Sequence, residues 1–221
     1  MYKILSVLSL AILLCSASLK AQVDNYALKF NKEGNVSFGT MNEMNELSTY
    51  TVQFWICPSS WTQRATIFSR GETFSAKLGV EGELLFTIGQ ELVSVISSAL
   101  TVNKWAHVSV INGDGNLVVR INNEVVKTES RSFVIPTSTD AFMLGGNFDG
   151  RIDELRIWRA VLSSDYNYMW QNTLNQYHPQ WKDLIAYYKF DQNFCPNIVD
   201  YTFHHHGSLS AKGVSGEIVS D

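Results

Sequence analysis

The stretch Tyr50–Pro58, YTVQFWICP, decides the fold class. Apolar side chains alternate along it with more polar ones, and the apolar set is Tyr50, Val52, Phe54 and Ile56. Because successive side chains of a β-strand point to opposite faces of the sheet, this period of two predicts a strand with one buried face.

Stretches of the same kind recur on both sides of this strand. Turn-forming pairs such as Glu81-Gly82 and Asn122-Asn123 separate several of them. Many short strands at this spacing predict an all-β fold, an antiparallel two-sheet jelly-roll sandwich. The further expected strands cover residues 26–30, 35–38, 65–69, 75–80, 83–88, 92–96, 105–111, 117–121, 124–127, 141–144, 152–158 and 184–190.

One segment departs from the period of two. A serine at 163 or 164 is a suitable helix cap, and apolar side chains follow it at helical spacing. We therefore expect one short helix near residues 163–175, covering an open end of the sandwich. The residues that set this pattern are Tyr166, Met169, Trp170 and Leu174.

The mature chain is expected to hold one domain, residues 22–210, since it contains no linker, repeat or low-complexity tract. Two alternatives stay open for the stretch that begins at residue 184. It closes the sandwich by pairing with the first strands, or it begins a second domain that the chain does not complete. Residues 211–221 are expected to be a C-terminal tail, and a longer parent protein stays open as well.

The first 21 residues are typical of a secretory signal peptide. Lys3 precedes an apolar run over 4–14, and a more polar stretch ends at Ala21, which predicts cleavage before Gln22. The apolar run is too short for a permanent transmembrane helix. Leu14 before Cys15 disfavours lipoprotein processing. We therefore expect export to the periplasm, the cell surface or the medium.

The charge balance excludes one class of partner. The chain has 17 Lys and Arg against 21 Asp and Glu, and removal of residues 1–21 leaves a net charge of −6. No basic cluster accompanies this mildly acidic balance. We therefore expect no binding to nucleic acid.

Two cysteines remain after cleavage, Cys57 and Cys195. Export permits a disulfide between them. Alternatively, Cys57 serves as a small apolar residue at the end of its strand. Two isolated cysteines do not make a structural zinc site, which normally needs four ligands.

Four blocks of the sequence follow one another in a distinctive order. They are 27–38, Tyr50–Pro58 (YTVQFWICP), 105–123 (beginning WAHV) and 144–163, which contains FDGRIDELRIW. Together they resemble the laminin-G-like, pentraxin-related jelly rolls of the concanavalin A-like lectin/glucanase superfamily, a type common in secreted bacterial proteins. Gln53 stands where this family usually has Glu, and Asn123 where it usually has Gly. A tail segment over 183–209 resembles the family as well and favours the closing-strand alternative.

Glycosidases also occur on this fold, and the laminarinase type carries Glu-x-Asp-x-x-Glu on one strand, so that two carboxylates flank the glycosidic bond. Around Asp153 the corresponding positions hold Arg151 and Arg156. Gly-x-Ser-x-Gly and His-Glu-x-x-His are absent from the sequence as well. We therefore expect no catalysis, with an atypical glycan-active hydrolase or lyase as the less favoured alternative.

The resemblance also implies a structural calcium ion. In such jelly rolls an aspartate like Asp153 binds Ca²⁺ with backbone carbonyls and loop oxygens, and Asp200 matches a second ligand. The loop Tyr201–His206, YTFHHH, replaces the usual small polar residues. The alternative is that Asp153 pairs with an arginine or caps a turn.

Two further patterns resemble metal sites. The loop 112–116, NGDGN, resembles part of an EF-hand but lacks the downstream Glu, so we expect a hairpin turn. His204, His205 and His206 are consecutive, and alternate side chains of an extended chain point apart. We expect them to lie in a solvated loop.

Aromatic rings that stack on sugars are the remaining candidates for a binding site. Trp55 lies off the apolar face of its strand, Trp61 follows in the next turn, and Tyr201 lies in the tail loop. The alternative for each of them is a place in the core.

These observations favour an exported, non-catalytic carbohydrate-binding or adhesive module, with a glycan or polysaccharide as ligand. A structural module that contacts a surface protein is the alternative.

Overall fold

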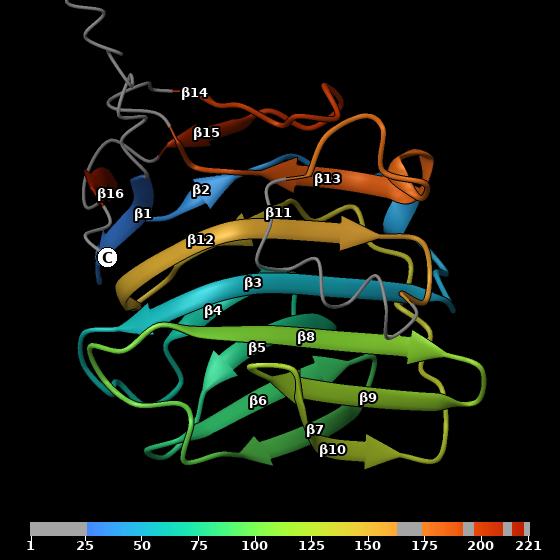
Figure 1. The fold of residues 1–221 in the computed structure, drawn as a ribbon, viewed down its shortest axis with the longest axis horizontal. Coiled ribbons are helices and arrows are strands. Elements are labelled where there is room, and N and C mark those ends of the chain that lie inside the picture. The colour runs from blue at the N-terminus through green and yellow to red at the C-terminus, as the bar shows by residue number, and fades with distance from the viewer. Residues whose placement is uncertain (1–25, 163–173, 192–196, 210–213, 219–221) are drawn as a thin grey trace, which may run out of the picture.

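A computed structural model describes residues 26–162, 174–191, 197–209 and 214–218. Over these residues the chain forms two eight-stranded antiparallel sheets that pack face to face (Figure 1). The predicted all-β sandwich is therefore confirmed. Short 3-10 turns, η1 (Asn42–Met44) and η3 (Trp181–Asp183), connect strands.

The first sheet, called sheet 1, has the order β10-β9-β8-β3-β12-β1-β16, and β13 also pairs with β12. The stretch that decides the fold, β3, lies near its middle (Figure 1). The strands are β10 (Glu124–Glu129), β9 (Asn116–Ile121), β8 (Ala106–Gly113), β3 (Tyr50–Pro58), β12 (Asp149–Trp158), β13 (Leu184–Tyr188), β1 (Tyr26–Asn31) and β16 (Val214–Ile218).

The second sheet, called sheet 2, has the order β14-β15-β2-β11-β4-β5-β6-β7. It lies behind sheet 1 in Figure 1. Its strands are β14 (Asn197–Ile198), β15 (Gly207–Leu209), β2 (Val36–Ser37), β11 (Phe142–Leu144), β4 (Thr66–Arg70), β5 (Phe74–Leu78), β6 (Glu83–Ile88) and β7 (Glu91–Ile96).

The core lies between the sheets, where the predicted apolar face of β3 is buried. Tyr50, Val52, Phe54 and Ile56 each expose 1% of their surface or less. The ring of Phe54 meets that of Phe68 on β4 edge to face at 6.0 Å, which joins the two sheets. Such edge-to-face pairs stabilise a core beyond the area that they bury.

Two hairpin turns have the geometry that their sequences predict. Asp114 and Gly115 join β8 to β9 with φ values of 50° and 79°, and Asn122 and Asn123 join β9 to β10 with 49° and 70°. Positive φ at both central positions matches the right-handed twist of the strands and favours Asn, Asp and Gly. The NGDGN stretch is therefore a hairpin turn.

The C-terminal part of the chain joins both sheets. β13 pairs with β12, the β14–β15 hairpin pairs with β2, and β16 pairs with β1. The closing-strand alternative is thus the one observed. The expectation of a tail from residue 211 needs correction, because Val214–Ile218 is a strand. Its sequence, VSGEI, lacks a strict alternation, and pairing with the edge of β1 explains its extended backbone.

Two predicted segments lie outside the described residues, namely the signal peptide over 1–21 and most of the helix near 163–175. Leu174 and Asn175, at the end of that helix prediction, are not helical. Among the residues that the structure places, no helix is long and apolar enough to span a membrane.

Candidate functional site

The face of sheet 1 that points away from the core carries polar side chains that are nevertheless buried. The strand registers place Ser109 of β8, Gln53 of β3, Arg156 of β12 and Tyr187 of β13 side by side across four strands. Each exposes 2% of its surface or less. We call these four residues the polar row. Half-buried Arg120 of β9 extends it, opposite Ser109.

A second row lies next to the first. His107 of β8, Trp55 of β3 and Asp153 of β12 are cross-strand neighbours in register, and we call them the Trp55 row. The imidazole of His107 meets the indole of Trp55 edge to face at 5.5 Å. His107 and Asp153 are buried, whereas Trp55 is half-buried. An indole ring with polar groups on both sides therefore lies at this surface.

A β-bulge in β12 shapes the site. The register with β3 shifts between Asp153 and Arg156, and Glu154 has a φ of 50°. Such bulges re-aim side chains. Here Oε2 of Glu154 accepts hydrogen bonds from Nη2 of Arg156 at 2.5 Å and from the hydroxyl of Tyr187 at 2.7 Å. The buried guanidinium therefore has a carboxylate partner, as a buried charge requires.

The pKa values of the two ionisable groups in the Trp55 row, Asp153 and His107, are shifted in opposite directions. Burial, together with the nearby charges of Glu154 and Asp191, raises the pKa of Asp153 to about 9. Burial and the charge of Arg156 lower the pKa of His107 to about 3. Desolvation disfavours the charged form of each group. At neutral pH both side chains are therefore uncharged.

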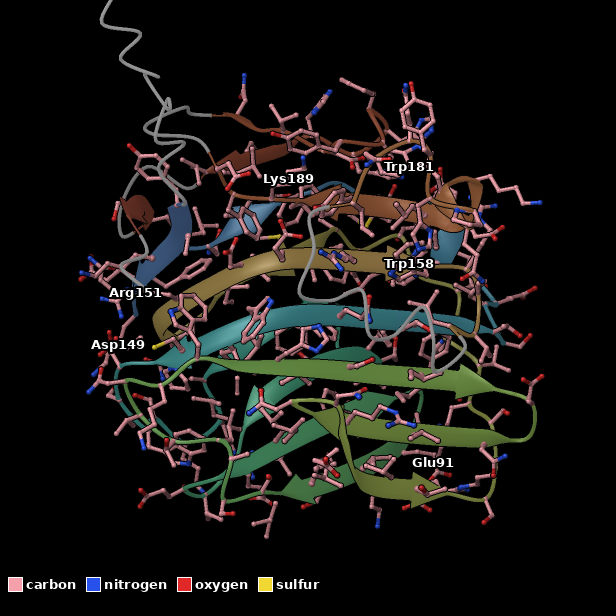
Figure 2. The ribbon with its side chains drawn as sticks, viewed as in Figure 1. Glu91, Asp149, Arg151, Trp158, Trp181 and Lys189 are labelled. Carbon is pink, nitrogen blue, oxygen red and sulfur yellow. The ribbon has the colours of Figure 1, made fainter. Side chains whose placement is uncertain are left out.

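Accessible aromatic and charged groups border the rows on the β13 side. Nζ of Lys189 lies 4.3 Å from the ring centre of Tyr201, and Tyr201 packs against Tyr187 at 5.8 Å. Lys189, Tyr201 and Asp191 are half-buried. Burial raises the pKa of Asp191, and the charge of Glu154 adds to this shift. Figure 2 labels Lys189 on this side of the molecule, with Trp181 and Trp158 farther along it.

A small apolar cluster supports this border. Trp158 is buried, and its indole Nε1 donates a hydrogen bond to Oε1 of Gln53 at 3.2 Å. The ring of Trp181 meets Tyr187 edge to face. The buried members of this second cluster, separate from the main core, are Trp158, Leu162, Leu174, Leu184 and Tyr187.

The structure brings two of the three predicted aromatic candidates to this face. Trp55 is the centre of its row, and Tyr201 lies at the β13 border. Trp61 does not join them, because it packs against the main core between the sheets. Trp61 is half-buried, as Trp55 and Tyr201 are, and ligand contact stays a prediction for all three.

The predicted calcium ligands are Asp153 and Asp200. In the described part of the chain they do not belong to any group of three or more His, Cys, Asp or Glu side chains that could hold a metal ion. The predicted site also uses backbone carbonyls and loop oxygens, so calcium binding stays a prediction.

Asp200 has a different role, which is to hold the loop after β14. Its two carboxylate oxygens accept five hydrogen bonds, at distances between 2.6 and 3.1 Å. Hydrogen bonds to an ionised carboxylate are stronger than those between neutral groups. The donors are the backbone N–H groups of Tyr187, Thr202, His204 and His205 and the hydroxyl of Thr202.

The three histidines lie in this loop, as predicted, and two of them, His204 and His206, are exposed. Nε2 of His205 lies 3.2 Å from the carboxylate of Glu43. Cys57 is buried on β3, with Nη1 of Arg151 at 3.9 Å from its sulfur. Cys195 lies outside the described residues, so the disulfide stays a prediction.

Sequence reasoning missed the polar row and His107. Their positions, 53, 107, 109, 156 and 187, are far apart along the chain. One local signal was available, since Gln53 and Trp55 alternate with the apolar residues of β3 and had to lie off the core. Only the strand order shows which side chains of other strands they meet.

The family profile of the concanavalin A-like lectin/glucanases superfamily matches residues 30–166. The chain belongs to this superfamily. Among curated protein sequences, none matches it significantly.

Several solved structures are similar to the chain in fold. A Bacteroides ovatus protein described as carbohydrate-binding matches 90% of the chain with a TM-score of 0.73 and 18% identity, and the chain spans 61% of that protein's length. The SAP-like pentraxin of Limulus polyphemus matches 89% of the chain and 96% of its own length, with a TM-score of 0.57 and 15% identity.

A third similar structure is the CBM40 module of the Ruminococcus gnavus IT-sialidase, bound to α2,3-sialyllactose. It matches 63% of the chain and 92% of its own length, with a TM-score of 0.51 and 14% identity. At these identities the likenesses establish the fold of the chain.

Proposed function

We propose that this chain is an exported, non-catalytic binding module that takes a carbohydrate on the outer face of sheet 1. One observation carries the proposal. Half-buried Trp55 lies between the polar side chains of Asp153 and His107, next to a row of buried polar groups. Sugar sites combine a flat aromatic surface with a few fixed hydrogen-bonding groups.

The rigidity of the face supports this function. Gln53 is held by the indole of Trp158, and Glu154 is held by Arg156 and Tyr187. Side chains fixed before the ligand arrives lose little conformational entropy on binding. The similarity to a protein described as carbohydrate-binding and to a sialyllactose-bound module is consistent with the proposal.

A glycan-active enzyme is the second candidate, and one observation favours it. Asp153 keeps its proton at neutral pH beside Glu154, the next residue in the chain. A protonated and an ionised carboxyl group form the usual pair of a glycosidase. Against this, the carboxylate of Glu154 is already engaged by Arg156 and Tyr187, which makes it a partner for the guanidinium.

The test is a binding screen of residues 22–221 against a broad panel of glycans and polysaccharides, in calcium and again in EDTA. We expect saturable binding to one class of glycan, the same in both buffers, and no release of sugar fragments. Absence of binding from a protein that melts cooperatively would refute the carbohydrate proposal and direct attention to surface proteins. If the parent releases sugar fragments and Asp153→Asn does not, the chain is a glycan-active enzyme instead.

Export is tested separately. When the full chain is expressed in a bacterium with its first 21 residues, we expect mass spectrometry of the exported product to find Gln22 at its N-terminus. A cytoplasmic product that keeps Met1 would contradict export.

A further inference from the structure

β7 is an edge strand of sheet 2 that lacks the usual protection. It pairs with β6 over six residues without a register shift. On its other side none of the described strands is hydrogen-bonded to it, and β10 of sheet 1 lies nearby. Its sequence, ELVSVI, contains no Lys, Arg or Pro. Natural proteins normally protect an exposed edge with such residues, with a bulge or with a very short strand.

The other end of sheet 2 and the neighbouring edge of sheet 1 show these protections. β14 has two residues. β10, the edge of sheet 1, has a register shift between Val125 and Lys127, and Lys127 pairs with Glu129 at 3.0 Å. Among these three edges, only β7 is both long and regular.

The side chains of β7 divide by face. Val93 and Val95 are buried in the core, whereas Leu92 and Ile96 expose 63% and 66% of their surfaces. Ser94 lies between them on the exposed face. These two large apolar side chains lie four residues apart on one edge strand. Covering them with another strand removes apolar surface from water, which is favourable.

The backbone N–H and C=O groups of β7 also alternate, between the side of β6 and the open edge. The two-residue turn Gly89-Gln90 joins β6 to β7, and Ile88 and Glu91 are the residues that flank it. In such hairpins the flanking residues exchange hydrogen bonds, and the hydrogen-bonded pairs then alternate along the ladder. The N–H and C=O groups of Leu92, Ser94 and Ile96 therefore point away from β6, toward the open edge.

We propose that β7 pairs antiparallel with β7 of a second copy of this chain, with Ser94 on the twofold axis. In this register Leu92 lies opposite Ile96 of the other copy, and Ile96 lies opposite its Leu92. The outward N–H and C=O groups of residues 92, 94 and 96 then satisfy one another, because these three residues pair among themselves. The two sheets 2 become one continuous sheet.

Self-complementarity is the reason for choosing a second copy as the partner. A twofold interface requires a patch that matches itself, and in this register each apolar side chain meets an apolar one. No like charges lie opposite each other, since Glu91 faces Ser97 of the other copy. The carboxylate of Glu91 is also paired with Arg131 at 2.7 Å.

The test measures the mass of residues 22–221 in solution by light scattering and analytical ultracentrifugation over a concentration series. We expect the parent to reach twice the mass of one chain, and Leu92→Lys and Ile96→Lys each to stay at the mass of one chain. Both positions are exposed, so both variants should melt like the parent. Val125→Lys, at a position that is 50% exposed on β10, is the matched control and should stay dimeric.

A cross-linking experiment tests the register. Cysteines at residues 92 and 96 of different copies lie opposite each other, so a mixture of Leu92→Cys and Ile96→Cys chains should form an intermolecular disulfide. Either variant alone should cross-link no more than the parent with its native cysteines. A parent that stays monomeric, a dimer that survives both lysine substitutions, or equal cross-linking by the single variants would overturn the proposal.

Discussion

Asp153 on β12 lies directly opposite Trp55 on β3, on the face of sheet 1 that points away from the core. His107 on β8 lies on the other side of the same indole. Burial keeps the proton on Asp153 and keeps the imidazole neutral at pH 7. The ring is thus bordered by polar groups without net charge.

The pKa of Asp153 predicts how stability depends on pH. Folding raises it from 3.8 to about 9, so between these values the folded state holds a proton that the unfolded chain has lost. Asp153 therefore makes the free energy of unfolding fall as the pH rises through this range, by up to about 1.4 kcal/mol per pH unit.

His107 acts in the opposite direction. Folding lowers its pKa from 6.5 to about 3, so below pH 6.5 the unfolded chain binds a proton that the folded state does not. Its contribution to stability falls as the pH falls through this range. The two slopes oppose each other between about pH 4 and 6.5, and the decline caused by Asp153 remains above pH 6.5.

Urea unfolding between pH 6.5 and 8.5 checks this account. The parent should lose stability across this interval, and Asp153→Asn, which mimics the protonated acid, should remove most of the slope. Asp114→Asn, in the exposed β8–β9 turn, is the control and should leave the slope unchanged. Equal slopes for the parent and Asp153→Asn would show that Asp153 is ionised in the folded protein.

Glu154 is predicted to stabilise the site through Arg156. In Glu154→Leu the buried guanidinium loses its carboxylate partner, and the hydroxyl of Tyr187 loses its acceptor. Because breaking a buried ion pair by removing one partner is costly, we expect a loss of about 3 kcal/mol in the free energy of unfolding. Glu81→Leu, at an exposed turn, should change it by less than about 0.5 kcal/mol. Equal, small losses would contradict the ion pair.

Asp200 is predicted to replace a metal ion in holding its loop. Asp200→Ala leaves four backbone amides without their acceptor, and we expect a loss of about 3 kcal/mol or more. The melting temperature of the parent should be the same in calcium and in EDTA. An increase in the melting temperature on addition of calcium that Asp200→Ala or Asp153→Ala abolishes would restore the calcium site.

The sequence predicted the sandwich because alternation is a local property. In β3, Tyr50 to Ile56 mark the buried face without knowledge of any partner strand. β15 and β16 escaped prediction, since Gly207–Leu209 and Val214–Ile218 become strands only through pairing with β2 and β1. The bulge at Glu154 left no sequence signal either, because a non-glycine residue with positive φ is set by its surroundings.

The candidate site was less accessible to sequence reasoning. Trp55 and Tyr201 were identified because an aromatic side chain off the core pattern is visible in the sequence. Trp61 looked equivalent, yet it packs against the core, since the path of the loop after β3 decides where its ring lies. Asp200 matched a family position, and only the five hydrogen bonds to it reveal its role.

The most direct test of the proposed sugar site compares Trp55→Ala with Trp61→Ala. Both remove a half-buried indole, but only Trp55 lies on the outer face of sheet 1. Isothermal titration calorimetry with the strongest glycan from the screen, well below both melting temperatures, measures the dissociation constant of each. We expect Trp55→Ala to weaken binding by about fivefold, since a stacked ring contributes about 1 kcal/mol, and Trp61→Ala to bind like the parent. Unchanged affinity in Trp55→Ala would contradict a glycan site on this face.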